Sequence, residues 1–288
     1  MKKDNPGQPA GKKIAILGAG NIGTAIARGL VSSGRARPQD ITLTRRRAEL
    51  LEPLRKENFV LQFDNWAAVK NAETVILAVG PSQLEELLRD IAPALTQTHT
   101  VISIVTGVTT AQLSEWAGKN VKIVRAMSNT AIAIGEAMTC LCAAPESAAA
   151  LDEAKTLFDA LGKTLVIKEE LMLAATALAG CGIAFFLRAV RAASQGGTQI
   201  GFHSEEALLM AAQTAKGAAE LLLRGASHPE SEIDKVTTPR GCTIEGLNEM
   251  EHNGFSSALI KGIVTSNEKA SRLFRKDDAG GGKSCKCE

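Results

Sequence analysis

The sequence predicts an α/β protein built as a doubly wound parallel sheet followed by an all-helical domain. Three observations lead to this prediction. Short apolar runs alternate with helical patterns up to about residue 165, a glycine-rich loop follows the first run, and strand patterns stop near Glu169. Strands separated by helices require crossover connections, which are right-handed and place helices on both faces of a parallel sheet.

The elements are read from the spacing of the apolar residues. Strands are predicted at residues 14–17, 41–44, 75–79, 100–105 and 122–125, and helices between them at 18–33, 48–57, 82–90 and 109–117. Later helical patterns cover 169–195, 204–225, 242–252 and 255–275. We therefore expect a flexible N-terminus at 1–12, the sheet domain at 13–168, the helical domain at 169–276 and a disordered tail at 277–288.

The first helix of the second domain has no polar face. Between Leu171 and Leu187 the chain carries no charge, and this stretch is at the short end for a membrane span. Its Gly and Ala content and its charged flanks favour a helix buried in protein. Because a helix that is apolar all round must be covered on every side, we expect a partner chain to complete its burial.

Composition narrows the class of protein. The 288 residues include 33 basic and 31 acidic residues, for a net charge of +2, so no electrostatic footprint for nucleic acid or an anionic membrane is expected. The six cysteines show no secreted-type framework, and the residues up to Lys13 lack the apolar stretch of a signal peptide. A cytoplasmic protein is the simpler interpretation. No metal-binding spacing and no Ser/His/Asp set is present, and the four histidines are scattered.

The glycine loop Gly18–Gly23 reads GAGNIG and lies between a predicted strand and a predicted helix. The first glycine allows a tight turn, the second lets a diphosphate approach the backbone, and the third lets helix and strand pack closely. The helix then offers unpaired amides to the phosphates. This context predicts a Rossmann-type site for a dinucleotide; a glycine-rich turn without a ligand is the alternative. The positions concerned are Leu17, Gly18, Ala19, Gly20, Asn21, Ile22 and Gly23.

The end of the second strand indicates which dinucleotide is bound. An NAD site usually has an acidic residue there, for the ribose hydroxyls, but this chain has Thr44 followed by Arg45, Arg46 and Arg47. Arginines would attract a 2′-phosphate through charge-assisted hydrogen bonds. We therefore expect NADPH as the cofactor, with NADH possible. A solvated basic helix start is the alternative.

A second candidate site lies at Val236–Leu247, which reads VTTPRGCTIEGL. Pro and Gly fix a turn, and a helical pattern starts directly after it. The amides of Gly241–Thr243 would form an anion site suited to a carboxylate, and the Thr243 hydroxyl could reach a neighbouring ligand atom. On pattern alone the stretch could equally be a capped helix start.

This stretch, with His228-Pro229 before it and Asn253-Gly254-Phe255 after it, resembles the C-terminal signature of the pyrroline-5-carboxylate reductases. Further matching pieces occur in order along the chain: the glycine loop, Ala78-Val79-x-Pro81, Gly107-Val108-Thr109, Arg125-x-Met127-x-Asn129-Thr130 and Gly180-x-Gly182. Together they span about residues 13 to 275, and their joint order is far more specific than any one piece.

The resemblance implies an NADPH-binding Rossmann-type domain and a helical domain that intertwines with a second subunit, in a homodimer or a higher oligomer. It implies hydride transfer from the nicotinamide to the C=N bond of 1-pyrroline-5-carboxylate, which gives L-proline. The backbone at Gly241, Cys242 and Thr243 would hold the carboxylate. The Thr243 hydroxyl would be the catalytic group that hydrogen-bonds the ring nitrogen.

The resemblance also implies roles elsewhere in the chain. Glu169 and Lys235 would line the site of the imino acid, where the family usually carries Glu and Asn. Arg45 and Asn65 would face the adenosine 2′-phosphate, with Arg46 beside them. The rest of the dinucleotide would run along Ala78, Val79, Gly80, Pro81, Ile104, Val105 and Thr106.

Four signature segments depart from the family pattern. Ser128 and Ala131 replace prolines, Ile183 and Phe185 stand where Pro and Tyr are usual, Arg240 replaces a glycine, and Gly80 replaces a lysine. Because of these departures, two other readings stay open. One is a related imine or hydroxyacid reductase acting on another small carboxylate, although hydroxyacid enzymes use a lysine that this chain offers only at Lys168. The other is a non-catalytic NADPH-binding regulatory protein.

Overall fold

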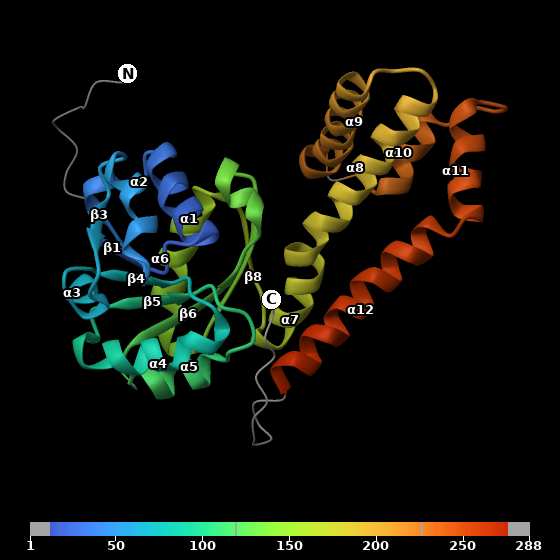
Figure 1. The fold of residues 1–288 in the computed structure, drawn as a ribbon. Coiled ribbons are helices and arrows are strands. Elements are labelled where there is room, and N and C mark those ends of the chain that lie inside the picture. The colour runs from blue at the N-terminus through green and yellow to red at the C-terminus, as the bar shows by residue number, and fades with distance from the viewer. Residues whose placement is uncertain (1–11, 119, 226, 276–288) are drawn as a thin grey trace. The chain divides into compact units, whose positions relative to one another are not determined.

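The structure is a computed structural model that describes residues 12–118, 120–225 and 227–275. By its internal contacts the chain divides into a unit that ends at Gly180 and resumes at Asn267, and a second unit spanning Cys181–Ser266 (Figure 1). Our predicted domain boundary at 168/169 therefore stays a prediction. The expected flexible N-terminus and the disordered tail with Cys285 and Cys287 lie outside the described residues, apart from Lys12.

The first unit contains an eight-stranded sheet in the order β3-β2-β1-β4-β5-β6-β7-β8. Its strands are β1 Ile14–Leu17, β2 Ile41–Thr44, β3 Val60–Gln62, β4 Thr74–Leu77, β5 Thr100–Ser103, β6 Lys122–Met127, β7 Ala137–Ala143 and β8 Gly162–Val166. Leu17, the last residue of β1, pairs with Thr44 on one side and Leu77 on the other. The chain therefore leaves β1, β2 and β4 at the same edge of the sheet.

Helices connect the strands. They are α1 Asn21–Ser32, α2 Glu52–Arg55, α3 Asn65–Lys70, α4 Pro81–Ile91, α5 Thr110–Ala117 and α6 Ala148–Asp159. The predicted fold class is confirmed, with every predicted strand and helix of this half present. The prediction missed β3, β7, β8, α3 and α6.

The five predicted strands pair parallel, as expected, but β7, which was missed, pairs antiparallel with β6. Only a short 3₁₀ segment, Thr130–Ile134, connects them. A parallel connection needs a crossover of a dozen or more residues, so this link permits only an antiparallel return. The longer stretch through α6 then places β8 parallel to β7.

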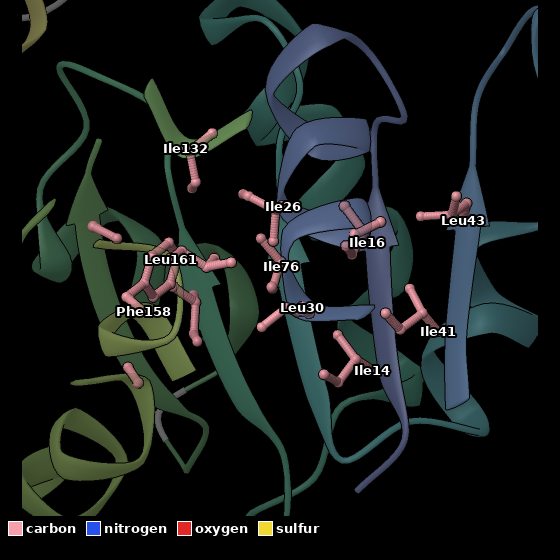
Figure 2. Close-up of a cluster of buried hydrophobic side chains, with 14 of the residues drawn as sticks. Ile14, Ile16, Ile26, Leu30, Ile41, Leu43, Ile76, Ile132, Phe158 and Leu161 are labelled. Atoms are coloured by element: carbon pink, nitrogen blue, oxygen red, sulfur yellow. The ribbon is translucent and has the colours of Figure 1, made fainter. Parts of the chain in front are cut away.

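The core lies on both faces of the sheet. Residues of β1 alternate between the two faces, yet all four are buried, as expected of a strand covered by helices on both sides. Figure 2 shows the layer formed by β1, β2, β4, α1 and the segment that ends at Leu161; its labelled side chains are Ile14, Ile16, Ile26, Leu30, Ile41, Leu43, Ile76, Ile132, Phe158 and Leu161. The opposite layer contains Leu17, Leu77, Leu84, Leu88 and Leu113. These two layers fix the loops that follow β1, β2 and β4.

The helical part begins with a 3₁₀ turn at Glu169–Leu171, α7 Met172–Ala175 and a π-helical segment Thr176–Cys181. The second unit then contains α8 Gly182–Gln199, α9 Ser204–Gly225, α10 Pro229–Val236 and α11 Cys242–His252; α12 Phe255–Arg275 begins in it and ends in the first unit. The predicted helices are present, and α10 was missed.

The apolar helix is largely uncovered within the single chain. By length and composition Glu169–Gln199 could cross a membrane, and only 17% of its most apolar 18-residue window is buried. Phe186 and Leu187 of α8 are exposed, as are Leu209 and Leu223 of α9. Taken by itself, the second unit therefore leaves these apolar side chains of α8 and α9 uncovered.

Candidate active site

The glycine loop after β1 has the geometry that a bound diphosphate requires. Gly18 has φ +105°, and a Cβ on it would lie 2.5 Å from the carbonyl oxygen of Ala78. A Cβ on Gly23 would lie 2.2 Å from the carbonyl oxygen of Gly18, whereas one on Gly20 would meet no atom within 4 Å. The first and third glycines are thus required by packing, and the second borders open space into which a ligand can come.

The start of α1 leaves hydrogen-bond donors unused. The amide of Thr24 donates to the carbonyl of Gly20 at 2.9 Å, so the preceding amides have no helical acceptor. Gly20 is the N-cap residue and contributes no side chain, and the first turn holds no acidic residue. Positive helix-end charge therefore faces the open space beside Gly20, which suits an anionic diphosphate.

A crevice surrounds this helix end. It lies where the strand order reverses between β1 and β4, which is where open α/β sheets bind ligands. Three hollows line it, the largest with a volume of about 380 Å³, and Arg45 borders all three. Among the predicted cofactor residues, these hollows are lined by Gly18, Gly20, Asn21, Arg45, Arg46, Asn65, Ala78, Val79 and Gly80. The structure therefore brings together residues from four separate segments of the chain.

Arg45 and Asn65 are held in place by neighbours within the crevice. Arg45 donates from Nη1 to the carbonyl oxygen of Ala19 at 3.0 Å, which ties it to the glycine loop. Thr44 donates to Oδ1 of Asn65 at 2.6 Å, so the amide nitrogen of Asn65 can donate to a ligand. Arg46 is exposed at the rim. This corner can hold a 2′-phosphate.

Some crevice residues were not predicted. Phe63 and Gln83 line the same hollow as Arg45, together with the acidic Glu86 and Asp90. Phe63 was missed because the short strand β3 before it gave no recognisable pattern. Of the predicted cofactor residues, Leu17, Ala19, Ile22, Gly23, Pro81, Ile104, Val105 and Thr106 do not line these hollows.

Glu169 is bound within the first unit by three donors. Its Oε1 accepts from the Thr110 amide and from Nη1 of Arg125, and its Oε2 accepts from the Thr110 hydroxyl, each at 2.7 Å. Burial raises the pKa of Glu169. These hydrogen bonds and the Arg125 charge together lower the pKa by more than burial raises it, so the net shift is downward. The side chain is thus an anchored carboxylate, a role that the sequence did not reveal.

The proposed substrate loop belongs to the second unit. Residues Thr238–Gly241 form a turn in which the Gly241 amide donates to the Thr238 carbonyl at 2.9 Å. Arg240 has φ +60° in this turn, a backbone region that favours glycine, which is the residue the resembled family carries there. Gly241 is the N-cap of α11 and supplies no side-chain cap. The amides at the start of α11 are therefore free to bind an anion.

The other residues predicted for this loop are placed as follows. Thr243 lies in the first turn of α11 and is partly exposed, and Cys242 is an exposed free thiol. Lys235, at the end of α10, is exposed and forms an ion pair of 2.7 Å with Glu232. A threonine hydroxyl and free helix amides can bind a carboxylate and an adjacent nitrogen.

The described residues contain no group of three or more His, Cys, Asp or Glu side chains that could hold a metal ion. His99 is buried, and its Nδ1 lies 3.0 Å from the Thr96 amide that donates to it. It is a structural residue.

Comparison with known proteins identifies the two parts of the chain. Residues 13–107 match the family described as NADP oxidoreductase coenzyme F420-dependent, and residues 169–273 match pyrroline-5-carboxylate reductase dimerisation. The fold and the crevice thus define a nicotinamide-nucleotide oxidoreductase with a helical dimerisation domain. The chain belongs to the pyrroline-5-carboxylate reductase family.

Relatives along the full chain support this assignment. Pyrroline-5-carboxylate reductase 2 of Dictyostelium discoideum is 47% identical over 91% of this chain and 93% of its own length. Pyrroline-5-carboxylate reductase 1 of the same organism is 50% identical over 91% of this chain, which spans only 50% of that protein.

Solved structures agree. A pyrroline-5-carboxylate reductase from Coxiella burnetii has a TM-score of 0.83 and 29% identity, covering 91% of this chain and 98% of its own. The Plasmodium falciparum pyrroline carboxylate reductase, solved with NADP bound, has a TM-score of 0.82 over 91% of this chain and 98% of its own; at 24% identity it shows the fold alone.

Proposed function

We propose that the chain reduces 1-pyrroline-5-carboxylate to L-proline with NADPH. The observation that carries this proposal is the open helix end beside Gly20, with Arg45 and Asn65 at the adjoining corner, in a chain of the pyrroline-5-carboxylate reductase family. The reaction saturates a ring C=N bond. The nicotinamide supplies the hydride when the cofactor is bound, and the protein orients the reactants.

The crevice fits the parts of NADPH. The free amides at the start of α1 suit the diphosphate, and Arg45 and Arg46 suit the 2′-phosphate. A charge-assisted hydrogen bond contributes about 1.5–3 kcal/mol, so one such contact favours NADPH over NADH by roughly tenfold or more. The ratio of the two dissociation constants, measured from the change in nucleotide fluorescence, tests this preference.

The loop before α11 fits the substrate. We assign the carboxylate to the backbone amides of Cys242 and Thr243 next to Gly241, since the Gly241 amide already donates to the Thr238 carbonyl and the start of α11 has no side-chain cap. The Thr243 hydroxyl then donates a hydrogen bond to the ring nitrogen, whose charge changes as the C=N bond is reduced. Hydride transfer further requires that the ring carbon comes within about 3–3.5 Å of the nicotinamide. Lys235, at the end of the preceding helix, provides a positive charge near the same loop.

We also propose that two copies of the chain form a homodimer through the helical domain, with higher oligomers built from such dimers. The match of residues 169–273 to a dimerisation family supports this, as do the exposed apolar side chains of α8 and α9. A second copy would cover the apolar helix Glu169–Gln199 and would give it a role other than crossing a membrane.

We place the protein in the cytoplasm. The free thiols of Cys140, Cys142, Cys181 and Cys242 are in keeping with that reducing compartment.

The decisive experiment combines a substrate panel with a change at Thr243. NADPH oxidation is followed with pyrroline-5-carboxylate and with other cyclic imino acids. Thr243→Ala should lower kcat by about 10²–10⁴-fold while the NADPH dissociation constant changes less than about twofold, because the residue belongs to a different unit from the crevice. Thr243→Ser, which keeps the hydroxyl, should retain most of the activity.

Three results would count against the proposal. Turnover confined to another imino acid would mean a different substrate. NADPH binding with no turnover on any of them would mean a non-catalytic protein. A loss of NADPH binding in Thr243→Ala would mean that the residue has been assigned to the wrong site.

A further inference from the structure

The bonds of Glu169 join two segments that are far apart in sequence. Thr110 lies 59 residues before Glu169 and Arg125 lies 44 residues before it. All three donors are 2.7 Å from the carboxylate oxygens, a distance typical of charge-assisted hydrogen bonds. A carboxylate that already accepts three such bonds has little capacity left for a substrate.

The first partner, Thr110, is the first residue of α5. The capping box of Thr109 and Gln112 satisfies the third amide of this helix, but its first turn contains no acidic residue. Glu169 supplies the missing negative charge and accepts from the Thr110 amide, and both effects stabilise a helix N-terminus. The start of α5 therefore depends on a carboxylate from another segment.

This helix start also ends the loop that follows β5. The loop runs from Ile104 to Thr109, and its first amide donates to the carbonyl of Leu77 at 3.1 Å. Its beginning is thus fixed by the sheet, and its end is fixed by the bonds of Thr110 to Glu169. Ser103 pairs with Leu77, so this loop leaves the sheet at the same edge as the loop after β4, and the family resemblance places the dinucleotide along Ile104–Thr106. A shift at Thr110 would therefore move backbone that faces the cofactor.

The second partner, Arg125, makes the link to Glu169 necessary. Arg125 lies in β6 beside Ser103 of β5, and its side chain is only 7% exposed. Its Nε is buried and has no acceptor within the part of the chain that the structure describes. A buried cation is costly without a partner, and Glu169 is the carboxylate that offsets its charge.

We propose that Arg125, Thr110 and Glu169 form a positioning network for the reduction. The network holds the backbone of the loop Ile104–Thr109 in the position that hydride transfer requires. Glu169 is a positioning residue in this network and not a ligand of the substrate. The proposal rests on the proposed function, because it assigns the network a consequence for hydride transfer.

The first experiment measures hydrogen exchange in the ligand-free protein. In Glu169→Ala the amide of Thr110 loses its acceptor, so exchange in the peptide covering residues 104–112 should accelerate at least about tenfold. Asp159→Asn is the matched control. Asp159 also accepts from a cation, Lys155, and from a threonine hydroxyl, Thr164, and its side chain is 43% exposed, against 36% for Glu169. Exchange at residues 104–112 should not change in the control.

The second experiment measures kinetics with pyrroline-5-carboxylate and NADPH. Because small misplacements of reacting groups can cost about 10²-fold in rate, Glu169→Ala should lower kcat by about 10–100-fold, with the substrate KM within about threefold of wild type. Thr110→Val, of nearly equal size, should lower kcat in the same direction, and Thr110→Ser should restore it. Asp159→Asn should leave kcat unchanged.

Distinct outcomes separate the possible failures. If Glu169 is a substrate ligand, Glu169→Ala raises KM at least tenfold and Thr110→Val leaves kcat unchanged, which overturns the proposal. Unchanged exchange at residues 104–112 in Glu169→Ala also overturns it. If Glu169→Ala does not fold, the Thr110 pair decides alone. If the wild-type protein does not reduce pyrroline-5-carboxylate, the proposed function fails, while the exchange measurement still decides whether the network holds the loop.

Discussion

Gly20 and Gly23 lie three residues apart in the same loop but have different surroundings. A Cβ on Gly20 would meet no protein atom within 4 Å, whereas a Cβ on Gly23 would lie 2.2 Å from a backbone oxygen. Gly20→Ala should therefore keep its Tm within about 2 °C but weaken NADPH binding by tenfold or more, since the added methyl group occupies ligand space. Gly23→Ala should lower the Tm as well, because backbone must move. Thermal unfolding and fluorescence titration check both; unchanged NADPH affinity in Gly20→Ala would place the diphosphate elsewhere.

The candidate site could be predicted from sequence where its chemistry is local. The glycine loop and the following arginines are defined by spacing within one strand–helix–strand unit, and the structure brings Gly20, Arg45 and Asn65 to one crevice. The anchoring of Glu169 could not be predicted in this way. Its partners Thr110 and Arg125 come from other elements, and only the pairing of β5 with β6 brings Arg125 beside the loop.

The segment between α1 and β2 contains a buried carboxylate that makes stability depend on pH. Asp40 is buried and accepts hydrogen bonds from Arg37 and Lys13. The hydrogen bond from Arg37 lowers the pKa of Asp40, burial raises it, and the hydrogen bond and charge of Lys13 lower it again. The net effect lowers the pKa from 3.8 to about 2. As the pH falls, the Asp40 carboxylate of the unfolded chain is protonated at a higher pH than that of the folded chain. The stabilisation is therefore complete above about pH 4 and is lost as the pH falls to about 2.

Asp40→Asn tests this dependence. The variant should lose about 1–2 kcal/mol of unfolding free energy at pH 7, a value reduced because Lys13 and Arg37 are half-exposed. Its stability should also fall less than that of the wild type between pH 4 and pH 2. Urea unfolding at several pH values measures both effects. Parallel pH profiles for the two proteins would show that Asp40 is not the titrating group.

Elements were predictable where hydrophobic periodicity was continuous. The strands β1 and β2 were predicted with their observed bounds, as were α9 and α11. The strand β8 was missed because it is partly exposed and has no continuous apolar run, whereas β7 was missed although it is mostly buried. The direction of β7 followed from the length of its connection to β6 and not from its own residues.

At the scale of the whole molecule, the second unit does not bury its own apolar side chains. Among the described residues of the second unit, Gly182 and Ala207 are buried, while most large apolar side chains of α8 and α9 stay exposed. Exposed apolar area of this extent marks an interaction surface. The sequence predicted such a surface from the helix without a polar face, since a small helical domain cannot bury that helix alone.

Leu209 of α9 provides a direct test of the homodimer. The wild-type protein should have twice the 30.3 kDa mass of the chain, or an even multiple of that chain mass, in light scattering after size exclusion. Leu209 is 70% exposed, and burying a leucine contributes about 1.5–3 kcal/mol. Leu209→Glu should therefore weaken each of the two symmetric contacts of the dimer. The variant should shift toward monomer or aggregate at micromolar concentration. Ile134→Glu is the control, since Ile134 is 77% exposed but lies in the first unit, and it should leave the mass unchanged. A monomeric wild-type protein, or equal dissociation in both variants, would mean that α9 is not part of the contact and that something else covers the apolar helices.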